Sequence, residues 1–315
     1  MKAIQIQDYG DAGALVLADA AMPVAGPGQV LVRVAAASVN PFDIKVRAGW
    51  LRGFFPLPMP HTLGTDFAGQ VVEVGAGVDK LQVGQRVFGM LTPMHGGTYA
   101  EYLAVDAAMV RPSPKTLSDI DAAALPLVGV TAMISVADLA QVRQGQTVLV
   151  HGAGGGVGGA VVMIAKSLGA RVVATCGTDK VDHVRTLGAD TVIDYQKGDF
   201  REQLRDVDAV IDPIGGEVNL RSYEVLRRGG TLVVILRNDP IEMANREALS
   251  AKYGVVVKEV AYDLRPDLLD RVAELADSGV LRANVHTVLP LAQAADAQRI
   301  SEAGHARGKI VLTIG

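Results

Sequence analysis

The residues best suited to chemistry form a glycine-rich segment that follows a short apolar run. The segment reads Val148-Leu149-Val150-His151-Gly152-Ala153-Gly154-Gly155-Gly156-Val157-Gly158. Ala153, Gly155 and Gly158 give the best match to the G-x-G-x-x-G spacing of a dinucleotide fingerprint, with alanine in the first position. Glycines let the backbone approach a pyrophosphate, and a following helix N-terminus presents unpaired N–H groups to it. The pattern predicts pyrophosphate contacts by Ala153, Gly155, Gly156, Val157 and Gly158. The alternative is a turn that only packs a helix on a sheet.

A second candidate follows the next apolar run, at Thr178, Asp179 and Lys180. An enzyme that uses NAD usually ends this strand with an acid for the ribose hydroxyls, and no acid stands at the end of residues 171–175. Lys180 suits a 2′-phosphate, which favours NADPH. Asp179 either contacts a ribose or begins the next helix.

These candidates need strands and helices that position them. From about residue 120, apolar runs alternate with amphipathic stretches. The runs predict strands at residues 147–150, 171–175, 191–193, 209–211, 231–235 and 255–260. Helices are predicted between them, for example at 157–168, 179–187 and 217–226. Six strands with crossover helices indicate an α/β fold with a doubly wound, six-stranded parallel sheet of the Rossmann type.

The two ends of the chain differ from this middle part. Up to about residue 115, short β-rich runs stand between glycines and prolines, which predicts a mostly antiparallel β domain. One short helix is expected after Asn40-Pro41. After residue 260, helices at 266–276 and 291–301 and a strand at 309–314 are expected to return to this first domain. The predicted division is 1–119 with 261–315, and 120–260.

Composition limits the class of protein. The 315 residues are 49% hydrophobic and 20% charged with a net charge of −4, which predicts a globular protein and gives no reason to expect nucleic acid. The single cysteine, Cys176, excludes an intramolecular disulfide and a multi-thiolate zinc site, and it favours a reducing compartment. The early Asp8 is unlike a signal peptide, so a cytoplasmic location is expected. Residues 144–165 lack charge, but their central glycines would break a membrane helix.

Longer motifs resemble one known family. They are Asn40-Pro41-Phe42-Asp43-Ile44-Lys45, Gly64-Thr65-Asp66-Phe67-Ala68-Gly69, Val83-Gly84-Gln85-Arg86-Val87-Phe88-Gly89, Gly97-Thr98-Tyr99-Ala100-Glu101-Tyr102, Gly129-Val130-Thr131-Ala132 and Leu187-Gly188-Ala189-Asp190. With the glycine loop, they resemble the medium-chain dehydrogenase/reductases, and among these the zinc-free quinone oxidoreductase branch that includes zeta-crystallin. The resemblance spans nearly the whole chain. It implies a GroES-like catalytic domain joined to a Rossmann NADPH-binding domain. It also implies a homodimer, with which strands at 231–236 and 255–260 are compatible.

The resemblance assigns roles to single residues. It implies that Thr131 contacts the nicotinamide side, that Gly155 to Gly158 hold the pyrophosphate, and that Thr178 and Lys180 lie at the 2′-phosphate. Tyr195 is expected at the adenosine. Arg307 or Lys309 is expected to reach the cofactor from the last segment, unless both are solvated surface cations.

Zinc-dependent relatives hold a catalytic zinc with cysteine, histidine and acid ligands. Here Thr65-Asp66 stands in place of the histidine-acid pair, and Cys176 belongs to the nucleotide-binding half. The histidines, among them His61 and His95, show no ligand spacing. This pattern predicts chemistry without a metal. His61 is expected either near the substrate entrance or in a structural role.

The remaining equipment suits the reduction of an electron-poor acceptor. Alcohol oxidation needs a base or a Lewis acid, and neither is well placed. Reduction needs a nicotinamide hydride, an apolar slot and a hydrogen-bond donor for the acceptor oxygen. The Asn40-Pro41-x-Asp43-x-Lys45 form resembles enone and alkenal reductases of the branch, and Lys45 is the candidate donor. The alternative is a surface lysine paired with a carboxylate. Asn40 either positions substrate or braces the loop, and Asp43 is expected to hold local structure.

An apolar loop follows this motif and supplies Trp50, Leu51, Phe54 and Phe55. These side chains are expected to form acceptor walls, a dimer contact or a minor core. Met133 and the pair Arg237-Asn238 depart from the family pattern, and either would reshape the substrate pocket.

The sequence thus predicts an NADPH-dependent, zinc-independent oxidoreductase that transfers a hydride to a quinone or an α,β-unsaturated carbonyl. One alternative is a one-electron quinone reductase. Another is a non-catalytic NADPH-binding protein that serves as a redox sensor or a structural protein.

Overall fold

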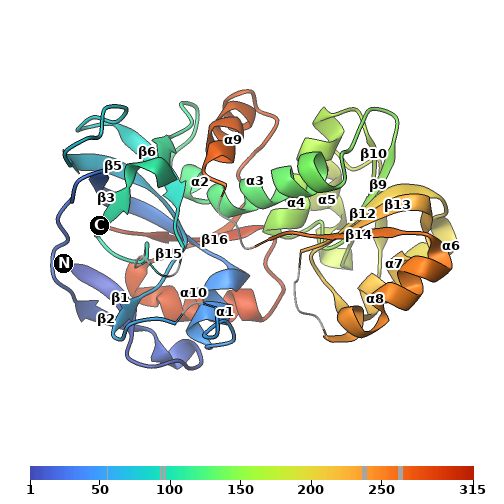
Figure 1. The fold of residues 1–315 in the computed structure, drawn as a ribbon, viewed down its shortest axis with the longest axis horizontal. Helices are drawn as coiled ribbons and strands as arrows, with labels where there is room; N and C mark the ends of the chain where they lie inside the picture. The colour runs from blue at the N-terminus through green and yellow to red at the C-terminus, as the bar shows by residue number, and fades with distance from the viewer. Residues whose placement is uncertain (55, 93, 95–96, 236–239, 262–264) are drawn as a thin grey trace. The chain divides into compact units, whose positions relative to one another are not determined.

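The computed structural model describes the chain except for residues 55, 93, 95–96, 236–239 and 262–264 (Figure 1). The chain forms two compact units. The first unit combines Met1–Leu127 with Leu264–Gly315, and the second is Val128–Asp263. The chain enters the second unit within helix α3 (Pro126–Met133). Both termini lie on the first unit (Figure 1).

The first unit is built on two β-sheets. The larger sheet has the strand order β15-β16-β3-β5-β6-β8, with β7 also paired to β3, and the smaller has the order β2-β1-β4. Their strands are β1 (Lys2–Ile6), β2 (Val16–Asp19), β3 (Gln29–Val39), β4 (His61–Thr62), β5 (Asp66–Val74), β6 (Arg86–Met90), β7 (Tyr102–Asp106), β8 (Val110–Pro112), β15 (Val285–Pro290) and β16 (Lys309–Thr313). All pairs are antiparallel except β15 with β16. The antiparallel domain predicted from the short β-rich runs is confirmed.

Short helices cover the sheets of the first unit. They are α1 (Pro41–Arg47), α2 (Asp119–Ala123), α9 (Asp267–Asp277), α10 (Ala294–Glu302) and the 3-10 turns η1 (Ala12–Ala14), η3 (Ala107–Met109) and η6 (Leu291–Gln293). Helix α2 packs on β3, β5, β6 and β16, so residues expected to begin the second domain contact the first unit. Strand β16 pairs with β3, with Ile310 opposite Val39, as expected for a returning tail.

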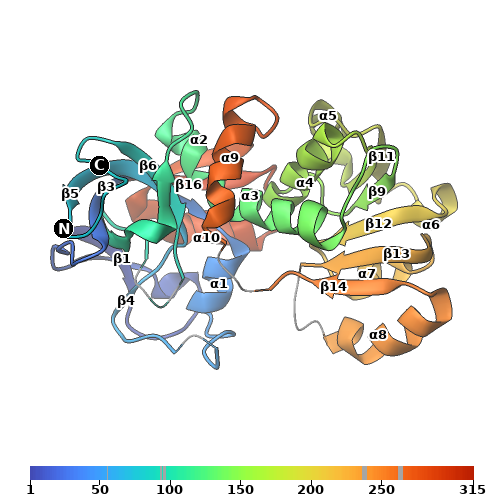
Figure 2. The same ribbon diagram turned by 45° about the horizontal axis from the view of Figure 1, so that its top comes forward.

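The second unit contains the predicted parallel sheet. Its strand order is β11-β10-β9-β12-β13-β14, and every neighbouring pair is parallel (Figures 1 and 2). The strands are β9 (Thr147–Val150), β10 (Arg171–Cys176), β11 (Thr191–Asp194), β12 (Val207–Asp212), β13 (Leu226–Val234) and β14 (Val256–Glu259). Counted along the chain, this order is 3-2-1-4-5-6, the order of the doubly wound Rossmann fold. The predicted fold class is therefore confirmed.

The helices of the second unit either precede the first parallel strand or lie between the strands. They are η4 (Ile134–Leu139), α4 (Gly156–Ser167), η5 (Thr178–Lys180), α5 (Val181–Thr186), α6 (Phe200–Gln203), α7 (Gly216–Ser222) and α8 (Pro240–Tyr253). Helices α4 and α5 contact strands β9, β10 and β11, whereas α7 and α8 contact β13 and β14 (Figure 2). Among the residues described, no helix has the length and apolar character needed to cross a membrane.

The core of the second unit explains why the apolar runs form strands. Leu149, Val173, Val210 and Leu232 come from four different strands, and each is completely buried in one cluster. Burial of such a side chain stabilises the fold by roughly 1.5–3 kcal/mol. A parallel strand covered on both faces therefore shows a continuous apolar run.

Candidate functional site

The glycine loop lies between β9 and α4 and is tightly wound. A Cβ on Gly158 would lie 2.3 Å from the carbonyl oxygen of Gly152, which explains why this position needs glycine. Ala153 is buried and donates its N–H to the Thr175 oxygen, while the Gly155 N–H bonds the Gly152 oxygen. Gly155 begins α4 without a side-chain cap. The first N–H groups of α4, at Gly156 to Gly158, therefore have no intrahelical partner and suit an anion.

The predicted adenosine-side residues gather beside this loop. A Cβ on Gly154 would lie 2.6 Å from the Cδ atom of Lys180, so the aliphatic part of Lys180 lies against the glycine loop. A Cβ on Gly177 would lie 3.2 Å from the hydroxyl oxygen of Tyr195, whose side chain is 61% exposed. Tyr195 and Lys180 thus flank the end of β10, next to the loop.

Thr178 has partners that the sequence did not indicate. Its hydroxyl donates to Asp194 Oδ2 at 2.6 Å, and its N–H donates to Gln196 Oε1 at 3.0 Å. Asp194 ends β11 and pairs with Cys176 in the parallel register. Asp194 could have been found from the sequence by its place at the end of the neighbouring predicted strand, since the carboxyl ends of parallel strands lie along one edge of the sheet.

His151 fixes the start of the glycine loop from inside the unit. Its ring is buried, with Nδ1 2.9 Å from Thr175 Oγ1 and Nε2 3.0 Å from Ser222 Oγ. Ser222 donates its only hydroxyl proton to the Val218 oxygen at 2.7 Å. Nε2 must therefore carry the proton and donate to Ser222, while Nδ1 accepts from Thr175. Burial lowers the pKa of His151, so the ring is neutral and serves as a structural link.

Thr131 lies on α3 in the second unit, and its backbone oxygen accepts the Ser135 hydroxyl at 2.7 Å. Helix α3 continues into η4, which packs on α4. The contact expected between Thr131 and the nicotinamide side remains a prediction.

In the first unit, Asp43 organises the start of α1. Its carboxylate accepts the Asn40 N–H at 2.8 Å, the Thr65 hydroxyl at 2.5 Å and the Tyr99 hydroxyl at 3.0 Å. The group is fully buried, and desolvation raises its pKa to about 6 despite these donors. Asp43 holds local structure, as the sequence predicted.

Asn40 and Lys309 belong to the same buried network. The Asn40 Nδ2 group donates to Asp66 Oδ2 at 2.9 Å, and the Lys309 ammonium donates to the Val39 oxygen at 3.0 Å and to Asn40 Oδ1. Asn40 is 2% exposed and Lys309 is 5% exposed. Of the two roles considered for Asn40, these contacts favour bracing the loop. Lys309 is not a solvated surface cation, and its predicted cofactor contact remains a prediction.

The contacts of this buried network decide whether its side chains fit a zinc ion. Asp66 already accepts the Ser38 hydroxyl at 2.8 Å and the Leu127 N–H at 3.0 Å, and the Lys309 ammonium lies 3.7 Å from it. Burial raises the pKa of Asp66 and lowers that of Lys309, while their mutual attraction opposes both shifts. Cys176 lies in the second unit. Within the described ranges, no three histidine, cysteine or acid side chains come together as ligands. The Asp66 carboxylate already accepts hydrogen bonds from Ser38, Asn40 and Leu127 and lies beside the Lys309 ammonium, so these side chains do not fit zinc.

Lys45 lies in the middle of α1, whose two ends are fixed. Asp43 fixes the first turn, and buried Arg47 fixes the last by donating to the Gly10 oxygen at 3.1 Å, to Gln298 Oε1 at 2.6 Å and to Glu302. Lys45 is half-buried, and burial lowers the pKa of its ammonium. No described residue forms a hydrogen bond or an ion pair with that ammonium. Among the described residues, no carboxylate pairs with Lys45, and the alternative of a surface lysine in an ion pair is therefore not supported there.

The apolar loop after α1 divides into buried and exposed side chains. Leu51 is buried, whereas Trp50 is 72% exposed and Phe54 is 66% exposed. Phe55, His95, Arg237 and Asn238 lie outside the described residues. His61 is buried on β4, and Met133 is half-buried at the end of α3. Trp50 and Phe54 thus remain candidates for an acceptor wall or a dimer contact.

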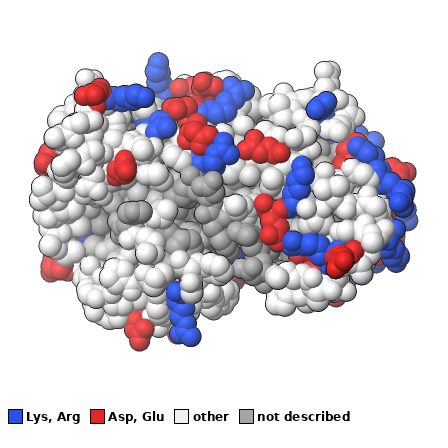
Figure 3. Space-filling model, in the orientation of Figure 1, with Lys and Arg blue, Asp and Glu red and all other residues white. Residues whose placement is uncertain are grey.

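Opposite charges mix on the surface. Arg201 pairs with both Asp199 and Glu224, and Arg227 pairs with Asp208. Figure 3 shows acidic and basic side chains intermingled on the face it presents. Their fields largely cancel at a distance.

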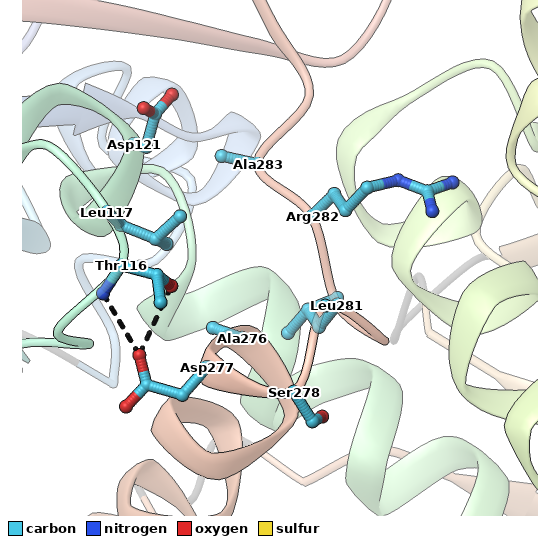
Figure 4. A pocket seen from close by; sticks show the side chains of 10 residues that line it. Thr116, Leu117, Asp121, Ala276, Asp277, Ser278, Leu281, Arg282 and Ala283 are labelled. Carbon is cyan, nitrogen blue, oxygen red and sulfur yellow. Dashed lines mark hydrogen bonds between the residues drawn. The ribbon is translucent and has the colours of Figure 1, made fainter.

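A cavity of about 450 Å³ lies in the first unit, between the segment at 116–121 and the end of α9 (Figure 4). Asp277 accepts both the N–H and the hydroxyl of Thr116, at 3.1 and 3.2 Å. Arg282 extends away from this pair (Figure 4). The predicted site residues do not line this cavity.

Comparison with known families gives two matches. Residues 26–115 match the family described as "Alcohol dehydrogenase GroES-like domain", and residues 187–312 match the family described as "Zinc-binding dehydrogenase".

Similar proteins were found among both sequences and structures. The chain is 33% identical to mouse "NAD(P)H oxidoreductase RTN4IP1, mitochondrial", over 91% of this chain and 82% of the relative. It is 38% identical to tomato "2-methylene-furan-3-one reductase", over 75% of this chain and 62% of the relative. A solved NAD-dependent alcohol dehydrogenase has a TM-score of 0.94 at 32% identity, covering 100% of both chains. Escherichia coli quinone oxidoreductase complexed with NADPH has a TM-score of 0.90 at 25% identity, covering 99% of this chain and 100% of the other.

Proposed function

This chain belongs to the medium-chain dehydrogenase/reductase superfamily and is an oxidoreductase, and we propose that it transfers a hydride from NADPH to a quinone or an α,β-unsaturated carbonyl without zinc. The mouse relative is named for NAD(P)H, and the bacterial structure contains NADPH. The tomato relative's substrate name denotes a methylene group conjugated with a ketone. These names support both the cofactor and the acceptor class.

The second unit supplies the cofactor-binding residues of this proposal. NADPH, when bound, supplies the hydride. The uncapped N–H groups of Gly156, Val157 and Gly158 bind the pyrophosphate, since Gly158 allows α4 and the loop to approach closely. Lys180 is held against the glycine loop by its aliphatic stem, and its ammonium attracts the 2′-phosphate.

Lys45 of the first unit carries the chemistry of the proposal. Reduction of an enone places negative charge on the carbonyl oxygen, and a preorganised donor stabilises that charge. The observation that carries this role is a half-buried ammonium without a described partner, on a helix fixed at both ends. Its lowered pKa makes Lys45 a stronger donor than an ordinary lysine. Solvent supplies the proton that the carbon next to the carbonyl takes up.

The donor set around Asp66 supports the zinc independence of this proposal. The Lys309 ammonium stands beside that carboxylate, and Asn40 and Ser38 donate to it. A chelator is therefore expected to leave turnover unchanged.

A homodimer completes the proposal. Strand β14 forms one edge of the parallel sheet, and Val256 on it is 47% exposed. An edge strand offers unpaired backbone groups to a second copy.

The experiment replaces Lys45 by methionine and follows NADPH oxidation with 2-cyclohexenone and with 1,4-naphthoquinone. We expect kcat/KM for the enone to fall roughly 100-fold, because one preorganised donor is lost. Lys45→Arg should retain part of the activity, and Lys80→Met, which removes an exposed lysine of the same unit, should retain all of it.

Two further measurements separate chemistry from binding. The Kd for NADPH should be the same in wild type and Lys45→Met, and the enone product should be the saturated ketone. An unchanged kcat/KM in Lys45→Met would remove this lysine from the mechanism.

A further inference from the structure

The ends of β10 and β11 lie side by side and form the edge at which the adenosine ribose is expected. Cys176 pairs with Asp194, and the N–H of Tyr195 donates to the Cys176 oxygen at 3.1 Å. Neighbouring strands lie about 4.8 Å apart. The carboxylate of Asp194 is therefore close to whatever Thr178, Lys180 and Tyr195 bind.

Thr178 directs both of its donors away from a ligand. Its hydroxyl proton goes to Asp194 Oδ2 at 2.6 Å, and its N–H goes to Gln196 Oε1 at 3.0 Å. A threonine hydroxyl has one proton and two lone pairs, so toward a ligand it now acts as an acceptor. A ribose 2′-hydroxyl can donate to an acceptor. A 2′-phosphate dianion has no proton to give and is bound by donors.

Asp194 also contributes a negative charge. The hydrogen bond from Thr178 is the main cause that lowers the pKa of Asp194, so the carboxylate is ionised at neutral pH. Its side chain is 11% exposed, and the Lys197 ammonium, 70% exposed, lies 3.4 Å away. An exposed lysine of this kind compensates a carboxylate only weakly. The adenosine side thus combines an attractive group for a 2′-phosphate, Lys180, with a carboxylate, Asp194, that opposes it.

We propose that Asp194 is a specificity-determining residue that holds the Thr178 hydroxyl as an acceptor and repels a 2′-phosphate, so that NADH remains usable beside NADPH. The inference rests on the proposed function, because it concerns the same cofactor. Lys180, which follows β10, is one determinant of the choice between the two cofactors. Asp194, at the end of β11, is the second determinant that we add.

The test is Asp194→Asn, which removes the charge and keeps Oδ1 as the acceptor for the Gln196 N–H. Binding of NADH and of NADPH to the full chain is measured by nucleotide fluorescence. We expect the Kd for NADPH to fall roughly tenfold, as for one unit charge removed a few ångströms from a phosphate near a protein surface. The Kd for NADH should change by less than about twofold. The gain should shrink at high salt, because exposed charges are screened.

Two other variants complete the design. Asp194→Ser removes the carboxylate in a different way and should shift the NADPH-to-NADH ratio in the same direction. Asp190→Asn removes an equal charge just before the other end of β11, where the carboxylate pairs with Lys166 at 2.8 Å, and should leave the ratio unchanged.

The outcomes separate the two proposals. If wild type binds both nucleotides and the ratio is the same in Asp194→Asn and Asp194→Ser, the role of Asp194 is wrong and the proposed function stands. If wild type binds neither nucleotide, both are wrong. An equal shift in Asp190→Asn would show a general charge effect and would also overturn the role of Asp194.

Discussion

Replacing Gly158 with alanine tests how closely the glycine loop approaches α4, and Gly159 provides a neighbouring control. A Cβ on Gly158 would lie 2.3 Å from the Gly152 oxygen, 2.7 Å from the Gly152 carbonyl carbon and 2.9 Å from the Ala153 Cα. All three are backbone atoms, so the loop itself must move. A Cβ on Gly159 would meet Leu187 Cδ1 at 3.2 Å, and that side chain can rotate away.

The expected changes in unfolding free energy have opposite signs at Gly158 and Gly159. Alanine in a helix is more stable than glycine by about 1 kcal/mol, which Gly159→Ala should gain in part or in full. Overpacking costs about 1–3 kcal/mol, and the upper part of this range applies where backbone must shift. We therefore expect Gly158→Ala to lose about 2 kcal/mol of unfolding free energy after the gain in helix propensity is subtracted.

The assay is urea unfolding followed by circular dichroism, together with titration of each variant with NADPH. Gly158→Ala should also bind NADPH at least about tenfold more weakly, because the displaced loop no longer presents the helix N-terminus to the pyrophosphate. Gly159→Ala should bind as wild type does. If the two variants unfold at the same urea concentration and bind NADPH equally, the close approach of loop and helix is not needed.

Two predictions concern pH. Burial raises the pKa of Asp43 from 3.8 to about 6, so between these pH values the folded state keeps a proton that the unfolded chain loses. The unfolding free energy therefore falls as pH rises from 3.8 to 6, by up to about 3 kcal/mol. Asp43→Asn should flatten the curve of unfolding free energy over this pH range. Burial lowers the pKa of His151 below 6.5, so its contribution is complete above pH 6.5 and is lost as pH falls toward the folded-state pKa. His151→Gln should remove that acid-side loss, measured by urea unfolding at several pH values, and a variant curve parallel to wild type in either window would contradict the burial argument.

Much of the second unit was predictable because burial on both faces leaves a continuous apolar run. Predicted strands at 147–150 and 171–175 differ from β9 and β10 by at most one residue. Strand β13 was harder: it begins at Leu226, five residues before the prediction, because Arg227 to Gly230 interrupt the apolar pattern. A parallel partner, β12, holds this polar stretch in the sheet through a register shift.

Helix α8 lies between two predicted strands, where a crossover helix was expected, but the sequence pattern gave no bounds for it. Its only fully buried residue is Glu242, which pairs with Arg246 on the next turn. A helix without an apolar stripe gives little periodic signal.

Candidate site residues could be named from the sequence only where the local chain carries their motif. The glycine loop and Lys45 were identified from their own motifs. Asp194 and the partners of His151 were not, because Thr175 and Ser222 lie 24 and 71 residues from His151. The burial of Lys309 was also hidden, since it depends on pairing between β16 and β3 across the length of the chain.

The returning tail has a consequence for how the protein is made. A ribosome releases residues 128–263 as one continuous stretch, and the second unit can fold while synthesis continues. Residues 1–127 emerge earlier but lack β16, and with it the Lys309 ammonium that lies 3.7 Å from the buried Asp66 carboxylate and lowers its pKa. We therefore expect the half translated first to be the half that matures last.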